Sequence, residues 1–132
     1  MRRTVSTPNE EIVRLGIDAY NRGDFEALLE HFDPAVVLHD PGRTGRSFHG
    51  HDGLMQFWGE WLENWDSYRL EPVEFVVDGE EIFVACEQRA RGKLSGVEIS
   101  QPLFSVYRFR DSKVVELRVY ADRAPALDSM HG

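Results

Sequence analysis

Apolar and polar residues alternate from Gln101 to Asp122, in two runs that flank a short polar break. Such alternation is typical of β-strands, because successive side chains point to opposite faces of a sheet. Asp111 and Ser112, at the centre of the break, predict a two-residue turn and therefore a long hairpin. With that turn, one face of the hairpin is wholly apolar and is expected to be buried; it carries Phe104, Val106, Val115, Leu117, Val119 and Ala121. The opposite face, with Ser105 and Tyr107, is expected to meet water or a partner chain.

The first half of the chain follows the helical period instead. Apolar residues recur every three or four positions over Asn9 to Arg22 and over Asp52 to Trp65, which predicts two amphipathic helices. Between them, Asp24 is expected to cap a short helix that Asp33 and Pro34 end. Asp52 is expected to cap the second long helix, which holds all three tryptophans.

The other segments predict a sheet. Alternating apolar residues indicate one strand before the tryptophan helix and a meander of about four strands after it, at Ala35 to Leu38, Leu70 to Val77, Ile82 to Arg91 and from Val97 onward. Asp122 is expected to cap a last short helix. This order predicts a single α+β domain over residues 1–132, with residues 1–8 as a flexible arm and the helices on one face of a curved antiparallel sheet.

The composition narrows the classes of binding partner that are expected. Fifteen basic residues against 23 acidic ones give a net charge of −8, which repels nucleic acids and anionic membranes. No apolar run approaches the about 20 residues that cross a bilayer. The first eight residues lack the apolar segment of a signal peptide, so a cytoplasmic location is expected. The single cysteine, Cys86, excludes an internal disulfide and is expected to be buried.

Five short motifs together resemble the SnoaL-like branch of the nuclear transport factor 2-like superfamily, which includes ketosteroid isomerase-like proteins. They are Tyr20 to Phe25, Phe32 to Pro34, His39 to Pro41, Gly50 to Leu54 and Val119 to Arg123. The resemblance implies a cone-shaped sheet wrapped around about three helices over one pocket, commonly in a homodimer. It says less about chemistry, because relatives include polyketide cyclases, ketosteroid isomerases, an epoxide hydrolase and non-catalytic binding or scaffold domains.

Asp40 is the first candidate for catalysis. It matches, by motif, the general base of relatives that resemble ketosteroid isomerase, an aspartate before proline at the end of the first strand. A carboxylate at a cavity rim is partly desolvated and becomes a usable base. The alternative is that Asp40 only organises a turn. The isomerase's other donors fall at Gly16 and near Phe104 or Ser105, and the cyclases' aspartate falls at Val119, so neither mechanism transfers intact.

Arg89 and His39 are expected beside Asp40. Arg89 matches the arginine of the epoxide hydrolase, whose second acid falls at Arg91. If Glu87, Arg89 and Arg91 point into the cone, they form a charged end that binds a carboxylate or enolate. The alternative is an ordinary Glu87–Arg89 pair on the solvent face. His39 is expected on the inner side, as an acid or base or as a structural residue.

The remaining wall is expected to be apolar, formed by Tyr20, Trp58, Trp61, Phe104, Leu117 and Val119. His49 and His51 lack a clear third ligand, so neither a metal nor a cofactor is expected. The sequence therefore predicts a pocket for a small, mostly apolar molecule with a carbonyl or acidic group, and proton transfer by Asp40 or His39 with Arg89. A non-catalytic binding module and a dimeric scaffold with a self-filled cavity are the alternatives.

Overall fold

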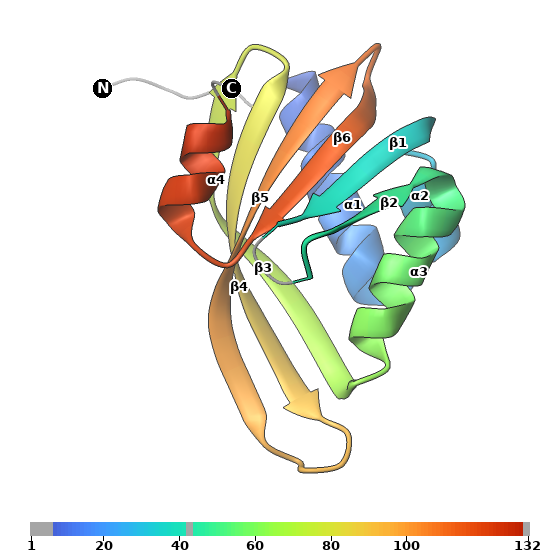
Figure 1. The fold of residues 1–132 in the computed structure, drawn as a ribbon, viewed down its shortest axis with the longest axis vertical. Helices are drawn as coiled ribbons and strands as arrows, with labels where there is room; N and C mark the ends of the chain where they lie inside the picture. The colour runs from blue at the N-terminus through green and yellow to red at the C-terminus, as the bar shows by residue number, and fades with distance from the viewer. Residues whose placement is uncertain (1–6, 42–43, 131–132) are drawn as a thin grey trace.

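The computed structural model describes residues 7–41 and 44–130, which form one curved six-stranded sheet with four helices (Figure 1). Along the sheet the strands follow the order β2-β1-β6-β5-β4-β3, and β1 and β6 are parallel while the other neighbours are antiparallel. The expected α+β class is confirmed. In chain order the elements are α1 (Pro8–Arg22), α2 (Phe25–Leu29), β1 (Phe32–Asp40), β2 (Arg46–His49), α3 (Gly50–Leu62), β3 (Trp65–Asp78), β4 (Glu81–Gly92), β5 (Glu98–Arg110), β6 (Lys113–Tyr120) and α4 (Arg123–Ser129).

The helix ends agree in part with the capping residues expected from the sequence. Thr7 caps α1, Gly23 ends it with φ of 74°, and the Asp24 side chain caps α2 as expected. Asp52 and Asp122 make no cap hydrogen bond: Asp52 lies inside the first turn of α3, and Asp122 holds the N-cap position of α4 without one. Of the expected flexible arm, residues 1–6 lie outside the described residues, and residues 7 and 8 belong to the start of α1.

Two boundaries differ from expectation. Asp33 and Pro34 belong to β1 instead of ending a helix, and Trp65 opens β3 instead of closing α3. Proline is tolerated in β1 because the pairing with β6 is irregular between Phe32 and Val37, where no ladder bond is needed.

The β5–β6 hairpin turns at Asp111 and Ser112, as predicted, with both residues at positive φ. Its predicted apolar face is wrong, because β6 contains a bulge at Val115, where the register shifts by one residue. Beyond the bulge, Leu117 pairs with Tyr107 and Val119 with Ser105. Phe104 and Val106 therefore face the opposite side of the sheet.

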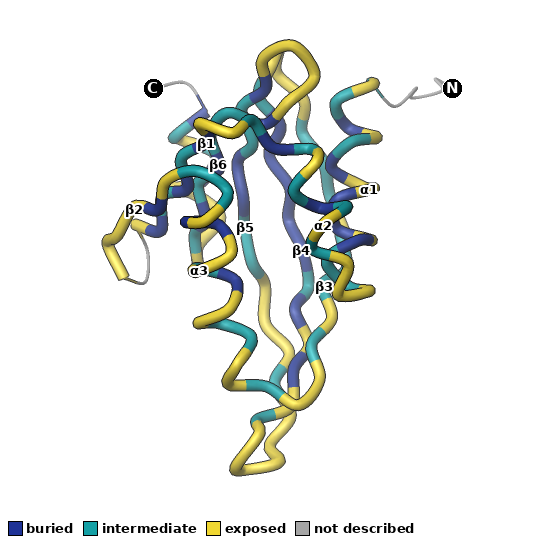
Figure 2. Tube along the Cα trace, turned by 90° about the vertical axis from the view of Figure 1, so that its right-hand side faces the viewer, coloured by how far each residue is buried: buried dark blue, intermediate teal, exposed yellow. Residues whose placement is uncertain are grey.

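Helices cover both faces of the sheet. On the concave face, α1, α2 and α3 enclose the main core with the buried residues Ile82, Val84 and Cys86 of β4. On the outer face, α4 packs its Ala126 and Met130 against Phe83, Ala85 and Val106. Figure 2 shows burial along the middle of β4 and in the second half of β5, and exposure at the hairpin that joins them. None of the described helices is long and apolar enough to span a membrane.

Candidate functional site

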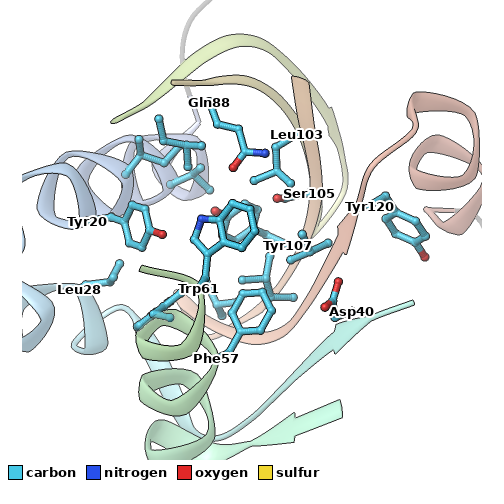
Figure 3. A pocket seen from close by; sticks show the side chains of 18 of the residues that line it. Tyr20, Leu28, Asp40, Phe57, Trp61, Gln88, Leu103, Ser105, Tyr107 and Tyr120 are labelled. Atoms are coloured by element: carbon cyan, nitrogen blue, oxygen red, sulfur yellow. The ribbon is translucent and has the colours of Figure 1, made fainter. Parts of the chain in front are cut away.

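A cavity of about 250 Å³ lies between the concave face of the sheet and helices α1 and α3 (Figure 3). Its wall is mostly aliphatic and aromatic, with polar groups at a few separate places. Gln101, Pro102 and Ala121 line it and are also exposed, so the cavity opens to solvent beside them. The other lining residues are Ile12, Val13, Gly16, Ile17, Tyr20, Leu28, His31, Phe32, Asp40, Phe57, Trp58, Trp61, Tyr68, Leu70, Gln88, Leu103, Ser105, Tyr107, Val114, Leu117, Val119 and Tyr120.

Asp40 is the acidic residue of this wall. It is the last residue of β1 and only 2% exposed. Its carboxylate accepts a hydrogen bond of 3.0 Å from Thr44 Oγ1, and its carbonyl accepts one of 2.8 Å from Gly45 N. Asp40 therefore organises the turn after β1 and also faces the cavity, so the two roles considered for it are compatible.

Side chains that can donate hydrogen bonds line the cavity from strands β3, β4, β5 and β6. Ser105 and Tyr107 project from β5, and Gln88 projects from β4, where its Oε1 accepts a bond of 2.6 Å from the Tyr68 hydroxyl. Removal from water raises the pKa of Tyr107, and the nearby Cys86 and Tyr68 add to this, so the phenol stays protonated as a donor. The sequence reasoning placed Ser105 and Tyr107 on the outer face and did not single out Gln88.

The expected aromatic wall is present. Trp58, Trp61 and Tyr20 all line the cavity, together with Leu117 and Val119. Trp58 is 7% exposed and belongs to the core, whereas Trp61 is half-buried and packs at a tilt against Trp65, with 5.3 Å between ring centres.

His39 is absent from the cavity wall, contrary to expectation. It follows Leu38 and precedes Asp40, which are both buried, so alternation turns its ring to the outer face of β1. There, Nδ1 lies 2.8 Å from Ser47 Oγ and Nε2 lies 3.3 Å from Glu116 Oε2.

The expected charged end of the cavity is also not formed. Glu87, Arg89 and Arg91 lie on the outer face of β4, where Glu87 accepts from Ser100 and Arg91 pairs with Glu98 at 2.8 Å. The sequence reasoning assigned the wrong residues of β4 to the inner face. The first residues of this strand are buried on both faces, so the apolar pattern there does not alternate.

Phe104 is likewise outside the wall and stacks on Phe83, with 6.1 Å between ring centres. The bulge at Val115 accounts for this, because it separates Phe104 from the face that Leu117 and Val119 share.

No group of three or more potential ligand side chains able to hold a metal ion occurs in the described part of the chain. His51 instead contacts the Phe32 carbonyl, with 2.9 Å between Nε2 and the oxygen.

His31 adds a titratable group to the cavity wall. Burial holds its pKa below the ordinary 6.5, and the positive charge of Lys113 lowers it further, while Glu30 acts in the opposite direction. The folded protein therefore favours the neutral ring, and the unfolded chain binds the proton more tightly.

Acidification should consequently destabilise the protein through His31. The free energy of unfolding falls as pH drops below 6.5, and His31→Gln should reduce this fall. Urea unfolding of both proteins at about pH 7.5 and about pH 5.5 measures it. His49→Gln, at an exposed histidine, is the control. An unchanged pH dependence in His31→Gln contradicts the prediction.

Residues 13–117 match the family model described as the SnoaL-like domain. The chain belongs to this family. Its fold is similar to that of solved structures named as nuclear transport factor 2-like and ketosteroid isomerase-like. No curated protein matches the sequence.

Three similar structures place this SnoaL-like protein among its relatives. TerC, co-crystallised with polyporic acid, is 22% identical with a TM-score of 0.79, over 95% of this chain and 96% of TerC. A protein with a ketosteroid isomerase-like fold from Catenulispora acidiphila, in complex with trimethylamine, is 15% identical with a TM-score of 0.77, over 93% and 92% of the two chains. A protein from Sinorhizobium meliloti, named as a candidate polyketide cyclase, is 26% identical with a TM-score of 0.66, over 83% and 93%.

Proposed function

We propose that this SnoaL-like protein binds a small, flat molecule that carries carbonyl oxygen and transfers a proton at the carbon beside that carbonyl. The observation that carries the proposal is Asp40, a carboxylate only 2% exposed in the wall of an otherwise largely apolar cavity. Most carboxylates stay at the surface, because burying one costs free energy unless it is compensated. The relatives named for polyketide cyclisation, or crystallised with polyporic acid, support a substrate of this class.

In this mechanism, Asp40 removes the proton from the carbon next to the carbonyl, and the electron pair moves onto the oxygen as an enolate. The Tyr107 and Ser105 hydroxyls supply hydrogen bonds to that oxygen, which stabilise the developing charge in a site with little water. Asp40 then returns the proton to another carbon, which is an isomerisation. Alternatively, the enolate carbon attacks a second carbonyl and the new alkoxide takes the proton, which is a cyclisation.

The proposal is tested without knowing the natural substrate. A simple aryl ketone, 1-indanone, has protons beside its carbonyl that a base exchanges for deuterium in D₂O, and proton NMR follows their loss. The protein should accelerate this exchange over buffer alone. Buffer-level exchange of 1-indanone and of a panel of cyclic enones and diketones would sink the proposal.

A non-catalytic binding module is the second candidate. It is favoured by Val119, which stands where the cyclase relatives have their aspartate by the sequence comparison. Such a protein binds the same ligands in the cavity but leaves the exchange rate at the level of buffer.

We also propose that the protein pairs as a homodimer through the outer face of the sheet. On this face Arg69 lies directly opposite Arg89, and the neighbouring row places Glu71 opposite Glu87. Like charges that face each other across strands are destabilising. Arg69 and Glu71 already pair along β3, with 3.7 Å between Nε and Oε1, so the dimer mainly serves the other two residues. In a two-fold, face-to-face arrangement Arg89 of one copy meets Glu87 of the other.

Arg89→Glu should therefore shift the protein from dimer to monomer, as measured by light scattering after size exclusion. Arg110→Glu, at the exposed end of β5, is the matched control and should remain dimeric. A wild type that is monomeric at all concentrations would exclude the dimer. For location we propose the cytoplasm, which fits a single free, buried Cys86.

A further inference from the structure

Gln88 is a buried amide that the proposed mechanism does not use. It is 4% exposed and lines the cavity from the middle of β4. A buried amide has two donor hydrogens and one acceptor oxygen to satisfy, and an unmet group costs free energy. Its place in the wall therefore requires an explanation beyond packing.

The Tyr68 hydroxyl fixes the orientation of this amide. It donates to Gln88 Oε1 at 2.6 Å, which occupies the acceptor side and turns the Nε2 hydrogens away from Tyr68. Within residues 7–41 and 44–130, no protein group accepts a hydrogen bond from Nε2. Gln88 thus presents an oriented donor to the cavity, where its ladder partners are Leu70 on β3 and Gln101 on β5.

Gln88 lies apart from Asp40. The two residues belong to β4 and β1, which β5 and β6 separate in the sheet. Three inter-strand steps amount to roughly 14 Å along the sheet surface, and its curvature shortens the direct path. Figure 3 shows the two side chains at different ends of the group that lines the cavity. The amide is therefore suited to a ligand oxygen other than one that Asp40 contacts.

We infer that Gln88, held by Tyr68, is a specificity-determining residue that binds a carbonyl or quinone-type oxygen at the end of the cavity away from Asp40. An amide N–H donates only to an acceptor, so the subsite favours carbonyl oxygen over a bare hydrocarbon. Together with the aromatic side chains of Tyr20 and Trp61, it selects flat molecules with an acceptor oxygen at one end. This inference deepens the proposed function and rests on the same cavity.

Binding of 1-indanone and of indane tests the inference, because these molecules share one skeleton and differ in a single carbonyl oxygen. With one oxygen, 1-indanone is expected to bind mainly with that oxygen at Gln88. Its slow exchange is expected to proceed through a less populated pose with the oxygen at Tyr107 beside Asp40, so affinity and exchange report on different poses. Calorimetric titration is made in the Asp40→Asn background, so the result does not depend on turnover. The background protein should prefer 1-indanone. Adding Gln88→Leu should lower the affinity for 1-indanone by about tenfold and leave that for indane unchanged, as expected for one lost hydrogen bond.

Further variants separate recognition from a structural role. Tyr68→Phe should reduce the preference by about threefold, because the amide is no longer held. Gln56→Leu, on the exposed face of α3, is the matched control and should change neither affinity. The Gln88 side-chain amide signals in a nitrogen-15 NMR spectrum should shift with 1-indanone and not with indane.

Three results overturn the inference. One is a preference for 1-indanone over indane that Gln88→Leu leaves intact. In that case Gln88 serves only to accept the hydrogen bond from Tyr68, even if the variant is less stable. Another is a preference that is lost in Tyr107→Phe instead. The last is no binding of either compound. Failure of the proton-transfer proposal gives a different result. The protons of 1-indanone then exchange at the rate in buffer, while the Gln88-dependent preference for 1-indanone over indane persists.

Discussion

Asp40→Asn should reduce the protein-catalysed exchange of 1-indanone protons by about 10²- to 10⁴-fold, the usual contribution of a positioned general base. The amide has nearly the shape of the carboxylate but does not take up a proton at neutral pH. Its oxygen still accepts the hydrogen bond from Thr44, so the turn after β1 should persist. Initial exchange rates measured by proton NMR in D₂O give the ratio directly.

Controls distinguish lost chemistry from lost structure. Asp33→Asn makes the same change outside the cavity, where Asp33 Oδ1 accepts a bond of 2.8 Å from Ala35 N. Its exchange rate should stay within about twofold of wild type, since it makes no contact with the cavity. The affinity of Asp40→Asn for 1-indanone should also change little, because the ketone gives no proton in the ground state. Undiminished exchange in Asp40→Asn would remove Asp40 as the base and favour the binding module.

The parts that sequence reasoning predicted correctly depend on local signals. The turn at Asp111 and Ser112, the cap at Asp24 and the helical spacing around Trp58 each involve residues close along the chain. Such signals act within a few residues, and distant packing does not alter them. The placement of Asp40 in the cavity came from the family resemblance, since composition and periodicity equally allowed a simple turn.

The parts that were missed depend on long-range geometry. One extra residue at Val115 reverses which side of β5 meets Leu117 and Val119, and a bulge leaves no clear mark in an alternating apolar sequence. The inward face of β4 was misassigned for a related reason, because α4 buries Phe83 from the other side. The donors Ser105 and Tyr107 were therefore assigned to solvent, although both line the cavity.

These errors change which residues are available for chemistry in the pocket, but the pocket itself lies where it was expected. With Arg89 and His39 on the outer face, cationic stabilisation of an enolate is no longer available from the described wall. Neutral hydroxyl and amide donors take its place, and they suit uncharged carbonyl oxygen better than a carboxylate. The ligand class that we propose is therefore narrower than the class expected from the sequence: carbonyl-bearing molecules in place of carbonyl or acidic ones.

Trp58→Ala should lower the free energy of unfolding by about 3–5 kcal/mol, the range for removing a large aromatic side chain from a core. The Trp58 ring lies at the centre of an aromatic cluster. Its ring centre is 6.1 Å from that of Tyr20, 5.9 Å from that of Phe25 and 5.7 Å from that of Phe32. It joins α3 to α1, α2 and β1, so its loss removes contacts with three other elements at once. Urea unfolding at neutral pH measures the change.

Trp61→Ala is the matched variant, one helical turn further along α3. Its half-buried ring contacts fewer core residues, so the cost should be nearer about 1–2 kcal/mol, while the affinity for 1-indanone should fall because a wall of the cavity is lost. Equal destabilisation by the two substitutions would contradict this division between core and wall. The division matters for function because the rigid Trp58 cluster fixes α3 relative to the sheet. Trp61 is therefore held at the cavity, opposite the donors of β4 and β5.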